Sequence, residues 1–257
     1  MNKEIFFEFP SAIMTLAEII AYKRFEANAD HPLYKNGFVS LNQIFDDVCD
    51  FSPVDQHIRN PYCKVNVYSE KTLSNLAEAI IENDEIRENL QAAYGMKFSV
   101  DFIYSSQIAS IPTQDSEKPF YANEFHRDML FSSNVVKLFI ALEDIDQTQG
   151  PTEWISKEES QRIVRMGVRR REIKEHINDT FSFSVKKGQA CLVNPHTNIH
   201  KAGIPELGKF RSQLMVQLNP YMDWAINKDL YKRQFHREPN LPLLRNFGLR
   251  KPQVGRF

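Results

Sequence analysis

The amino-acid sequence predicts a single domain of mainly β structure with supporting helices. From residue 96 onward, short runs rich in β-branched and aromatic residues are separated by Pro, Gly, Asn and Asp, which is typical of a β-sandwich or β-barrel. Before residue 96, apolar residues recur at helical spacing. The 257 residues contain no internal repeat and no linker rich in Gly, Ser or Pro, and a chain of this length can bury a core with an internal pocket.

Helices are predicted in two segments of the N-terminal part. Residues 11–27 place apolar side chains at near-helical spacing after Ser11. Residues 69–95 predict a helix or a pair of helices, because Ser69 can cap the start and Gly95 can end it. We therefore expect residues 1–95 to form a helical support for the β core.

The β core is expected over about residues 96–220, followed by a C-terminal extension, 221–257. Its strands are predicted within five runs, at 96–111, 134–145, 179–185, 189–195 and 211–220. A basic segment, 157–176, interrupts them and is charged on most faces. It predicts a solvated helix, and the alternative is a lid that draws an anionic substrate toward the pocket.

Composition and charge exclude several classes of partner. Lys and Arg number 32 against 33 Asp and Glu, so no global field attracts nucleic acid or an acidic membrane. The cysteines, Cys49, Cys63 and Cys191, form no Cys-x-x-Cys pair and indicate buried thiols of a reducing compartment. The N-terminal stretch lacks the pattern of a secretory signal, and no apolar run reaches membrane-spanning length. We expect a cytoplasmic protein that acts on a small molecule.

One short motif combines a histidine and an aspartate. In NEFHRDMLF, residues 123–131, His126 and Asp128 are two positions apart. Side chains at i and i+2 of a strand point to the same face, so these two would converge while Arg127 points away. This arrangement predicts two ligands of one metal ion, and a surface turn is the alternative interpretation.

A second informative stretch covers residues 186–220. If the strand at 189–193 pairs across the following loop with a strand that starts near Arg211, then His200 and Arg211 face the same cavity. Two imidazoles and one carboxylate can occupy one face of an iron coordination sphere and leave positions for a chelating cosubstrate and O2. The guanidinium of Arg211 offers a bidentate fork to the distal carboxylate of a dicarboxylic cosubstrate.

Between about residues 96 and 220 the chain resembles the phytanoyl-CoA dioxygenase (PhyH-like) family of Fe(II)/2-oxoglutarate-dependent oxygenases. The motifs FHRD, VVKLFIALEDIDQTQGP, GQACLVNPHTNIHKAG and KFR follow one another in that family's order. The resemblance implies a double-stranded β-helix, a cupin-like jelly roll whose mouth holds the metal. It implies that His126, Asp128 and His200 bind Fe(II) and that Arg211 anchors 2-oxoglutarate.

The activity implied by this resemblance is that of a dioxygenase. It would hydroxylate or otherwise oxidise a small molecule, consume O2 and release succinate and CO2 from 2-oxoglutarate. Asp128 favours hydroxylation over halogenation, because a halide needs the position of this carboxylate. His196 competes with His200 as a ligand, and the family pattern favours His200. The family's histidine after the Gly-Pro turn is missing, since this chain reads QGPTEWISKEESQ there.

Three further residues are candidates for binding the cosubstrate. Ser105 and Gln107 share one face of a regular strand over 100–109, with Tyr104 on the other face. Lys137 lies in the middle of an apolar run, where an amine is costly to bury without an anionic partner. A carboxylate of the cosubstrate or substrate is one such partner, and a solvent-facing or edge lysine is the alternative.

Two other functions are consistent with the same residues. The three ligands could hold zinc in a hydrolase or lyase that activates water, with Arg211 binding an anionic substrate. A jelly roll could also bind a ligand without catalysis. Neither the substrate nor the oligomeric state follows from the sequence.

Overall fold

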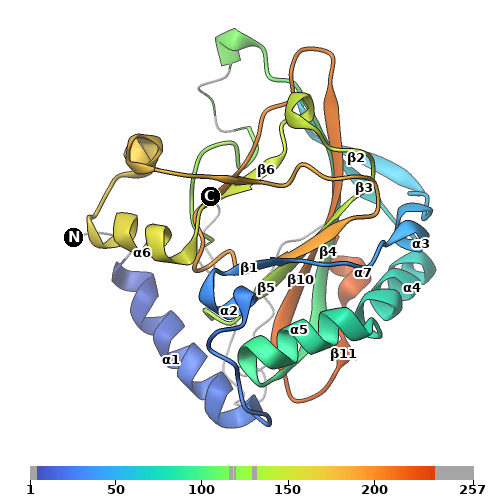
Figure 1. Cartoon of the computed structure of the whole chain (residues 1–257). Coiled ribbons are helices and arrows are strands. Elements are labelled where there is room, and N and C mark those ends of the chain that lie inside the picture. Colours follow the sequence, from blue (N-terminus) through green and yellow to red (C-terminus); the bar gives the residue numbers. More distant parts are fainter. Residues whose placement is uncertain (1–4, 116–117, 119, 129–131, 235–257) are drawn as a thin grey trace.

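The computed structural model describes residues 5–115, 118, 120–128 and 132–234, and its described strands form two sheets (Figure 1). The larger sheet has the order β1-β8-β5-β10-β4-β3-β2, with β11 parallel to β4. Its strands are β1 (Phe38–Ser40), β2 (Asp55–Asn60), β3 (Cys63–Val67), β4 (Lys97–Ala109), β5 (Val136–Ala141), β8 (Ala190–Val193), β10 (Phe210–Tyr221) and β11 (Ala225–Ile226). The smaller sheet has the order β7-β6-β9, with β6 (Thr152–Trp154), β7 (Phe181–Ser182) and β9 (His200–Ala202).

The helices begin and end where local chemistry allows. They are α1 (Ile5–Tyr22), α2 (Pro32–Lys35), α3 (Asp46–Cys49), α4 (Glu70–Ile81), α5 (Asp84–Tyr94), α6 (Lys157–Arg165) and α7 (Leu230–Arg233). Ser69 caps α4, Asn83 caps α5, and Gly95 ends α5 at a φ of 68°. The predicted helix pair is confirmed, whereas α1 runs through Ser11, its predicted start. In the described part of the chain, no helix combines the length and apolar character that a bilayer crossing requires.

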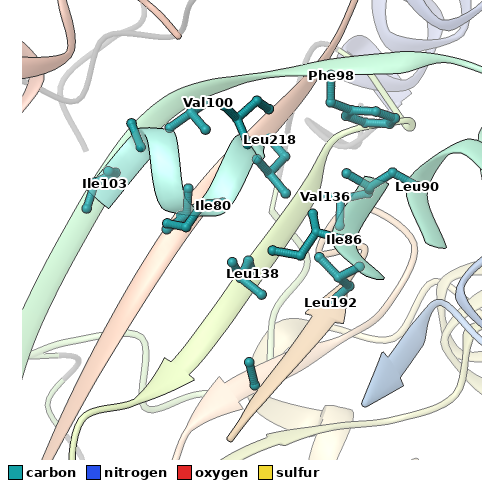
Figure 2. Packing of buried hydrophobic residues seen from close by; sticks show 14 of the residues in the cluster. Ile80, Ile86, Leu90, Phe98, Val100, Ile103, Val136, Leu138, Leu192 and Leu218 are labelled. Atoms are coloured by element: carbon teal, nitrogen blue, oxygen red, sulfur yellow. The ribbon is translucent and has the colours of Figure 1, made fainter. Parts of the chain in front are cut away.

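The central strands of the larger sheet are buried on both faces. On one face, Ile80 of α4 and Ile86 of α5 pack with Leu138 and Leu192, all fully buried (Figure 2). On the other face, side chains of β4, β5 and β10 pack with residues of the smaller sheet and its flanks; the cluster includes Phe102, Phe139, Met215, Trp154 and Phe183. Because side chains alternate along a strand, the two sheets enclose an interior that the helices do not reach.

The N-terminal part is not the purely helical support that the sequence predicts. It adds β1 to one edge of the larger sheet, beside β8, and β2 and β3 to the other edge, beside β4. The reason is visible in β2, whose sequence DQHIRN is polar and exposed along nearly its whole length, so hydrophobic alternation does not mark it. Of the predicted C-terminal extension, 235–257 lie outside the described residues.

Helix α1 is joined to the segment that follows the histidine–aspartate motif. The Ser132 hydroxyl and the Asn134 side-chain amide both donate to the Glu18 carboxylate, and the Thr15 and Ser133 hydroxyls are 2.9 Å apart. Glu18 is buried, and its burial raises its pKa to about 7 despite these two hydrogen bonds. An ionisable group therefore lies in the contact between α1 and the segment 132–134.

We expect Glu18 to make the protein less stable as the pH rises from about 4.5 to about 7. In this range the folded state retains a proton on Glu18 that the unfolded chain has lost, so raising the pH favours unfolding. A difference of roughly 2.5 pKa units corresponds to at most about 3 kcal/mol. Urea denaturation at about pH 5 and pH 7.5 should show this loss in the wild type and in the exposed-site control Glu26→Gln. The same loss in Glu18→Gln would contradict the assignment.

Candidate metal centre

His126 and His200 are brought together by a pair of backbone hydrogen bonds. The His126 N–H donates to the His200 carbonyl at 2.9 Å, and the His200 N–H donates to the His126 carbonyl at 2.8 Å. This isolated antiparallel bridge extends the smaller sheet beyond β9, in which His200 also pairs with Trp154. The two imidazole rings consequently lie side by side, with centroids 4.5 Å apart.

The ring nitrogens of both histidines have distinct roles. Nδ1 of His126 lies 2.8 Å from the Glu124 carbonyl, and Nδ1 of His200 lies 3.0 Å from the Asn198 carbonyl. A carbonyl only accepts hydrogen bonds, so each Nδ1 carries the proton and each Nε2 retains its lone pair. The same two bonds fix the orientation of the rings, as partners of metal-binding histidines do.

Asp128 completes a group of three potential ligands. Its backbone N–H donates to the Pro195 carbonyl at 2.9 Å, and its Oδ1 lies 3.6 Å from His126 Nε2 and 3.8 Å from His200 Nε2. One ligand atom from each residue lies within 4.8 Å of the others. Neighbouring ligands on an octahedral ion with bonds of about 2.1 Å are about 3 Å apart. A small closure therefore suffices to hold an ion, with two imidazoles and one carboxylate on one face.

Two of these side chains have their pKa values shifted toward the forms that bind metal. Burial lowers the pKa of His200 to about 4, so its imidazole is neutral at neutral pH. Burial alone would raise the pKa of Asp128, but the charge of Lys137 holds it well below its ordinary value. Asp128 is consequently a carboxylate at neutral pH.

The three ligands open into a cavity of about 200 Å³ between the sheets. Strands β4, β5 and β10 form one wall through Tyr104, Ser106, Ile108, Lys137, Phe139, Arg211, Gln213 and Met215. Of these residues, Tyr104, Lys137 and Arg211 were named from the sequence and the other five were missed. A signal existed for Phe139, two positions from Lys137, and for Gln213, two positions from Arg211 on the same strand face. Its Oε1 accepts a hydrogen bond from the Thr152 hydroxyl at 3.1 Å.

Arg211 is the buried cation of this cavity. The residue is 1% exposed, and its Nη1 donates to the Gly203 carbonyl at 3.3 Å. Among the described residues, its Nε has no hydrogen-bond partner and its guanidinium forms no ion pair. Burial lowers the pKa of Arg211 to about 10, so the group stays charged at neutral pH. A buried, incompletely paired guanidinium fits the carboxylate of an anionic ligand.

The structure brings His200 and Arg211 together by a route that the sequence did not predict. Strand β8 pairs with β1 and β5, and it does not pair with β10 across the loop. His200 instead belongs to β9 of the smaller sheet, and Arg211 belongs to β10 of the larger one. Both residues line one cavity because the two sheets face each other.

The predicted cosubstrate contacts of Ser105 and Gln107 require a correction. Neither residue lines the cavity: the Ser105 hydroxyl accepts from the Asn66 amide and the Tyr68 hydroxyl, and Gln107 Nε2 lies 3.5 Å from Ser212 Oγ. Tyr104 and Ser106, one position away, line the cavity instead. Because β4 is largely buried on both faces, alternation alone could not show which face turns inward.

Lys137 and His196 are placed unambiguously. Lys137 lies on the inner face of β5, its side chain is 14% exposed, and its Nζ donates to Asp128 Oδ2. Its anionic partner in this structure is thus a candidate metal ligand and not solvent. His196 lines a different cavity, of about 550 Å³, with its Nε2 3.4 Å from the Ser11 hydroxyl. The geometry therefore groups His200, and not His196, with His126 and Asp128.

The basic segment 157–176 forms α6 and a 3-10 turn (Arg170–His176). Arg162 Nη2 lies 3.1 Å from Glu159 Oε1, and Arg170 Nε lies 3.2 Å from Glu124 Oε2. None of the arginines in this segment lines the cavity of the three candidate ligands. The arrangement agrees with the solvated helix and provides no support for the lid.

No protein-family model matches this sequence, and no curated protein matches it. Among solved structures, the chain is similar to EctD from S. alaskensis with bound Fe, at 13% identity and a TM-score of 0.51, covering 83% of this chain and 88% of that chain. HygX from Streptomyces hygroscopicus, with nickel, 2-oxoglutarate and hygromycin B bound, has 12% identity, coverage of 77% and 89%, and a TM-score of 0.48. SnoN, a non-heme alpha ketoglutarate dependent epimerase from nogalamycin biosynthesis, has 13% identity, coverage of 73% and 79%, and a TM-score of 0.48.

At such low identity, similarity to solved structures shows the fold alone. The fold assignment is based on the EctD structure, whose TM-score is above 0.5. It confirms the predicted double-stranded β-helix: two facing, mainly antiparallel sheets with helices on the outer side of the larger one.

We expect single replacement of His126, Asp128 or His200 by alanine to weaken divalent metal binding by about 100-fold or more, because loss of an outer partner of a ligand already costs roughly 10- to 100-fold. Each variant should remain folded, since the three side chains line a cavity. Calorimetric titration with Co(II), alongside circular dichroism, measures both properties. The matched control His196→Ala should bind metal as the wild type does. Loss of binding in that control, with binding retained in His200→Ala, would overturn the ligand assignment.

Proposed function

We propose that this protein is an Fe(II)- and 2-oxoglutarate-dependent dioxygenase that hydroxylates or otherwise oxidises a small molecule. The observation that carries the proposal is the presence of His126, Asp128, His200 and the buried Arg211 in one cavity. Two imidazoles and a carboxylate leave three positions of a six-coordinate Fe(II) for a chelating 2-oxo acid and O2. Bound iron and 2-oxoglutarate would supply the chemistry, the oxidative decarboxylation that yields succinate and CO2.

Arg211 distinguishes this proposal from a metal site that only activates water. A 2-oxo acid chelated at the three ligands still has a distal carboxylate, which needs a partner inside the cavity. Arg211 is fully buried there, and its incompletely paired guanidinium can offer two parallel N–H donors to a carboxylate. The apolar side chains of Phe139 and Met215 line the same space and would help to keep water from the reacting groups.

The charges around the cavity support an anionic substrate. Arg59, Lys137 and Arg211 line it together with one acidic residue, Asp128. Lys137 is paired with Asp128, and Arg211 is assigned to the cosubstrate. Arg59, on the exposed strand β2, donates from Nη1 to the Tyr104 hydroxyl at 3.2 Å and remains available to an incoming anion. We therefore propose that the substrate carries a carboxylate or phosphate.

This substrate class can be tested with matched pairs of small molecules, each acid being compared with its neutral ester or amide. With Fe(II), 2-oxoglutarate and O2 present, acids should stimulate succinate formation more than their neutral partners. Arg59→Gln should raise KM for a responding acid by up to about fivefold, since an exposed ion pair is worth at most about 1 kcal/mol. Lys64→Gln, an exposed cation on the neighbouring strand, is the control. Equal stimulation by acids and neutral analogues would contradict the proposed charge.

The cosubstrate assignment predicts a specific effect of Arg211→Lys. Anaerobic addition of 2-oxoglutarate to the Fe(II)-loaded wild type should produce the weak visible charge-transfer band of a chelated 2-oxo acid. Lysine keeps the charge but loses the planar fork, so roughly 1.5 to 3 kcal/mol is at stake. The half-saturating 2-oxoglutarate concentration should therefore rise about tenfold to a hundredfold, with Fe(II) affinity nearly unchanged. Arg211→Ala should be weaker still, because the carboxylate would lose its cation.

The same titration separates the alternatives. Absence of the band in the wild type, together with tight zinc binding that 2-oxoglutarate does not affect, would favour the hydrolase or lyase. Absence of any metal binding would favour a non-catalytic jelly-roll binding protein. An unchanged 2-oxoglutarate dependence in Arg211→Lys would show that another cation anchors the cosubstrate.

A further inference from the structure

Lys137 occupies a rigid position inside the larger sheet. It lies on β5, which is hydrogen-bonded to a strand on each side, and its Cα is in register with Val193 of β8 and Gln217 of β10. The preceding Val136 and the following Leu138 are fully buried on the helix side, so the Lys137 side chain is directed inward. Its ammonium group has little freedom to leave the cavity.

Asp128 is held at two separate points. Its backbone N–H is bonded to the Pro195 carbonyl, and its Oδ2 accepts a hydrogen bond from Lys137 Nζ. Oδ1 is the oxygen that faces the Nε2 atoms of His126 and His200, at 3.6 Å and 3.8 Å. The carboxylate thus presents one oxygen to the metal position while the lysine occupies the other.

We propose that Lys137 is a positioning residue that restricts Asp128 to metal binding through a single oxygen. The inference rests on the proposed function. A carboxylate bound through both oxygens would take two positions on a six-coordinate ion and, with two histidines, would leave only two. A chelating 2-oxo acid and O2 together need three. By occupying Oδ2, Lys137 keeps the third position open.

The ammonium group also changes the charge of the site. Lys137 offsets the negative charge of Asp128, so the three ligands with Lys137 and a divalent ion carry a net charge near +2. This favours binding of a dianion such as 2-oxoglutarate at the metal. Lys137 therefore acts on cosubstrate binding through Asp128, without a contact of its own to the cosubstrate.

The test compares two replacements under anaerobic conditions, with Co(II) as the probe. Lys137→Met removes both the charge and the hydrogen-bond donor, whereas Lys137→Gln keeps an N–H donor. Lys97→Met is the matched control, because Lys97 pairs with Asp223 at 2.8 Å outside the cavity. The visible d–d absorption of Co(II) reports its coordination, and its change on addition of 2-oxoglutarate gives the affinity for the cosubstrate.

We expect Lys137→Met to bind Co(II) within about tenfold of the wild type, because loss of the hydrogen bond that orients Asp128 weakens metal binding while loss of the nearby positive charge strengthens it. Its Co(II) spectrum should nevertheless be altered before any 2-oxoglutarate is added. Its affinity for 2-oxoglutarate should fall by about tenfold or more, the size of effect typical of a partner of a metal ligand. Lys137→Gln should lie closer to the wild type than Lys137→Met in both measurements, and Lys97→Met should match the wild type. If Lys137→Met fails to fold, Lys137→Gln takes its place in the test. An altered Co(II) spectrum with weaker 2-oxoglutarate binding would support the inference, and wild-type values in both measurements would overturn it.

Three results would overturn the inference while the proposed function stands. An unchanged Co(II) spectrum with weaker 2-oxoglutarate binding would mean that Lys137 contacts the cosubstrate directly. No change in either measurement would remove its role, and identical behaviour of Lys137→Gln and Lys137→Met would assign the effect to charge alone. Failure of the wild type to bind Co(II) or 2-oxoglutarate would instead reject the proposed function, so the two failures are distinguishable.

Discussion

The candidate centre depends on the pair of backbone hydrogen bonds between His126 and His200. Directly opposed residues of an antiparallel pair project their side chains from the same face, so this bridge alone places the two imidazoles in one volume. His126 lies outside the regular strands and is held in place by its pairing with the edge of the smaller sheet. Asp128 is then held beside both rings by a backbone bond to Pro195, from the loop that leads to His200.

One face of the larger sheet packs into the hydrophobic core, and the other lines the cavity of the candidate ligands. Along β5, Val136, Leu138 and Ile140 pack into the core beneath the helices, while Lys137 and Phe139 turn toward the cavity. A shift of one residue in the pairing of β5 would exchange these sets and place an ammonium among the helices. The packing of α4 and α5 against the sheet therefore also determines which residues reach the candidate metal position.

The buried charges of the fold differ in how completely they are paired. Asp101, fully buried in β4, forms an ion pair with Arg233 and thereby joins α7 to the sheet. Arg211, equally buried, has only a carbonyl partner among the bonds described for its side chain, and it lies in the cavity with the three ligands. A buried cation without a direct ion pair is costly, and a fold that retains one at a cavity wall is suited to binding an anion there.

The sequence alone predicts three features, because local spacing and residue chemistry indicate them directly. These are the helix pair over 69–95, the strand-rich region after residue 96 and the His-x-Asp motif. Three other features were decided only by the tertiary structure. Strands β1–β3 belong to the larger sheet, Ser105 points away from the cavity, and Lys137 forms an ion pair with Asp128. Strand β2 is polar and carries no hydrophobic period, β1 and β3 span only three and five residues, and a strand buried on both faces does not indicate its inner side. Such features depend on which segments distant in the sequence pair with each other, and that pairing is determined only when the whole chain packs.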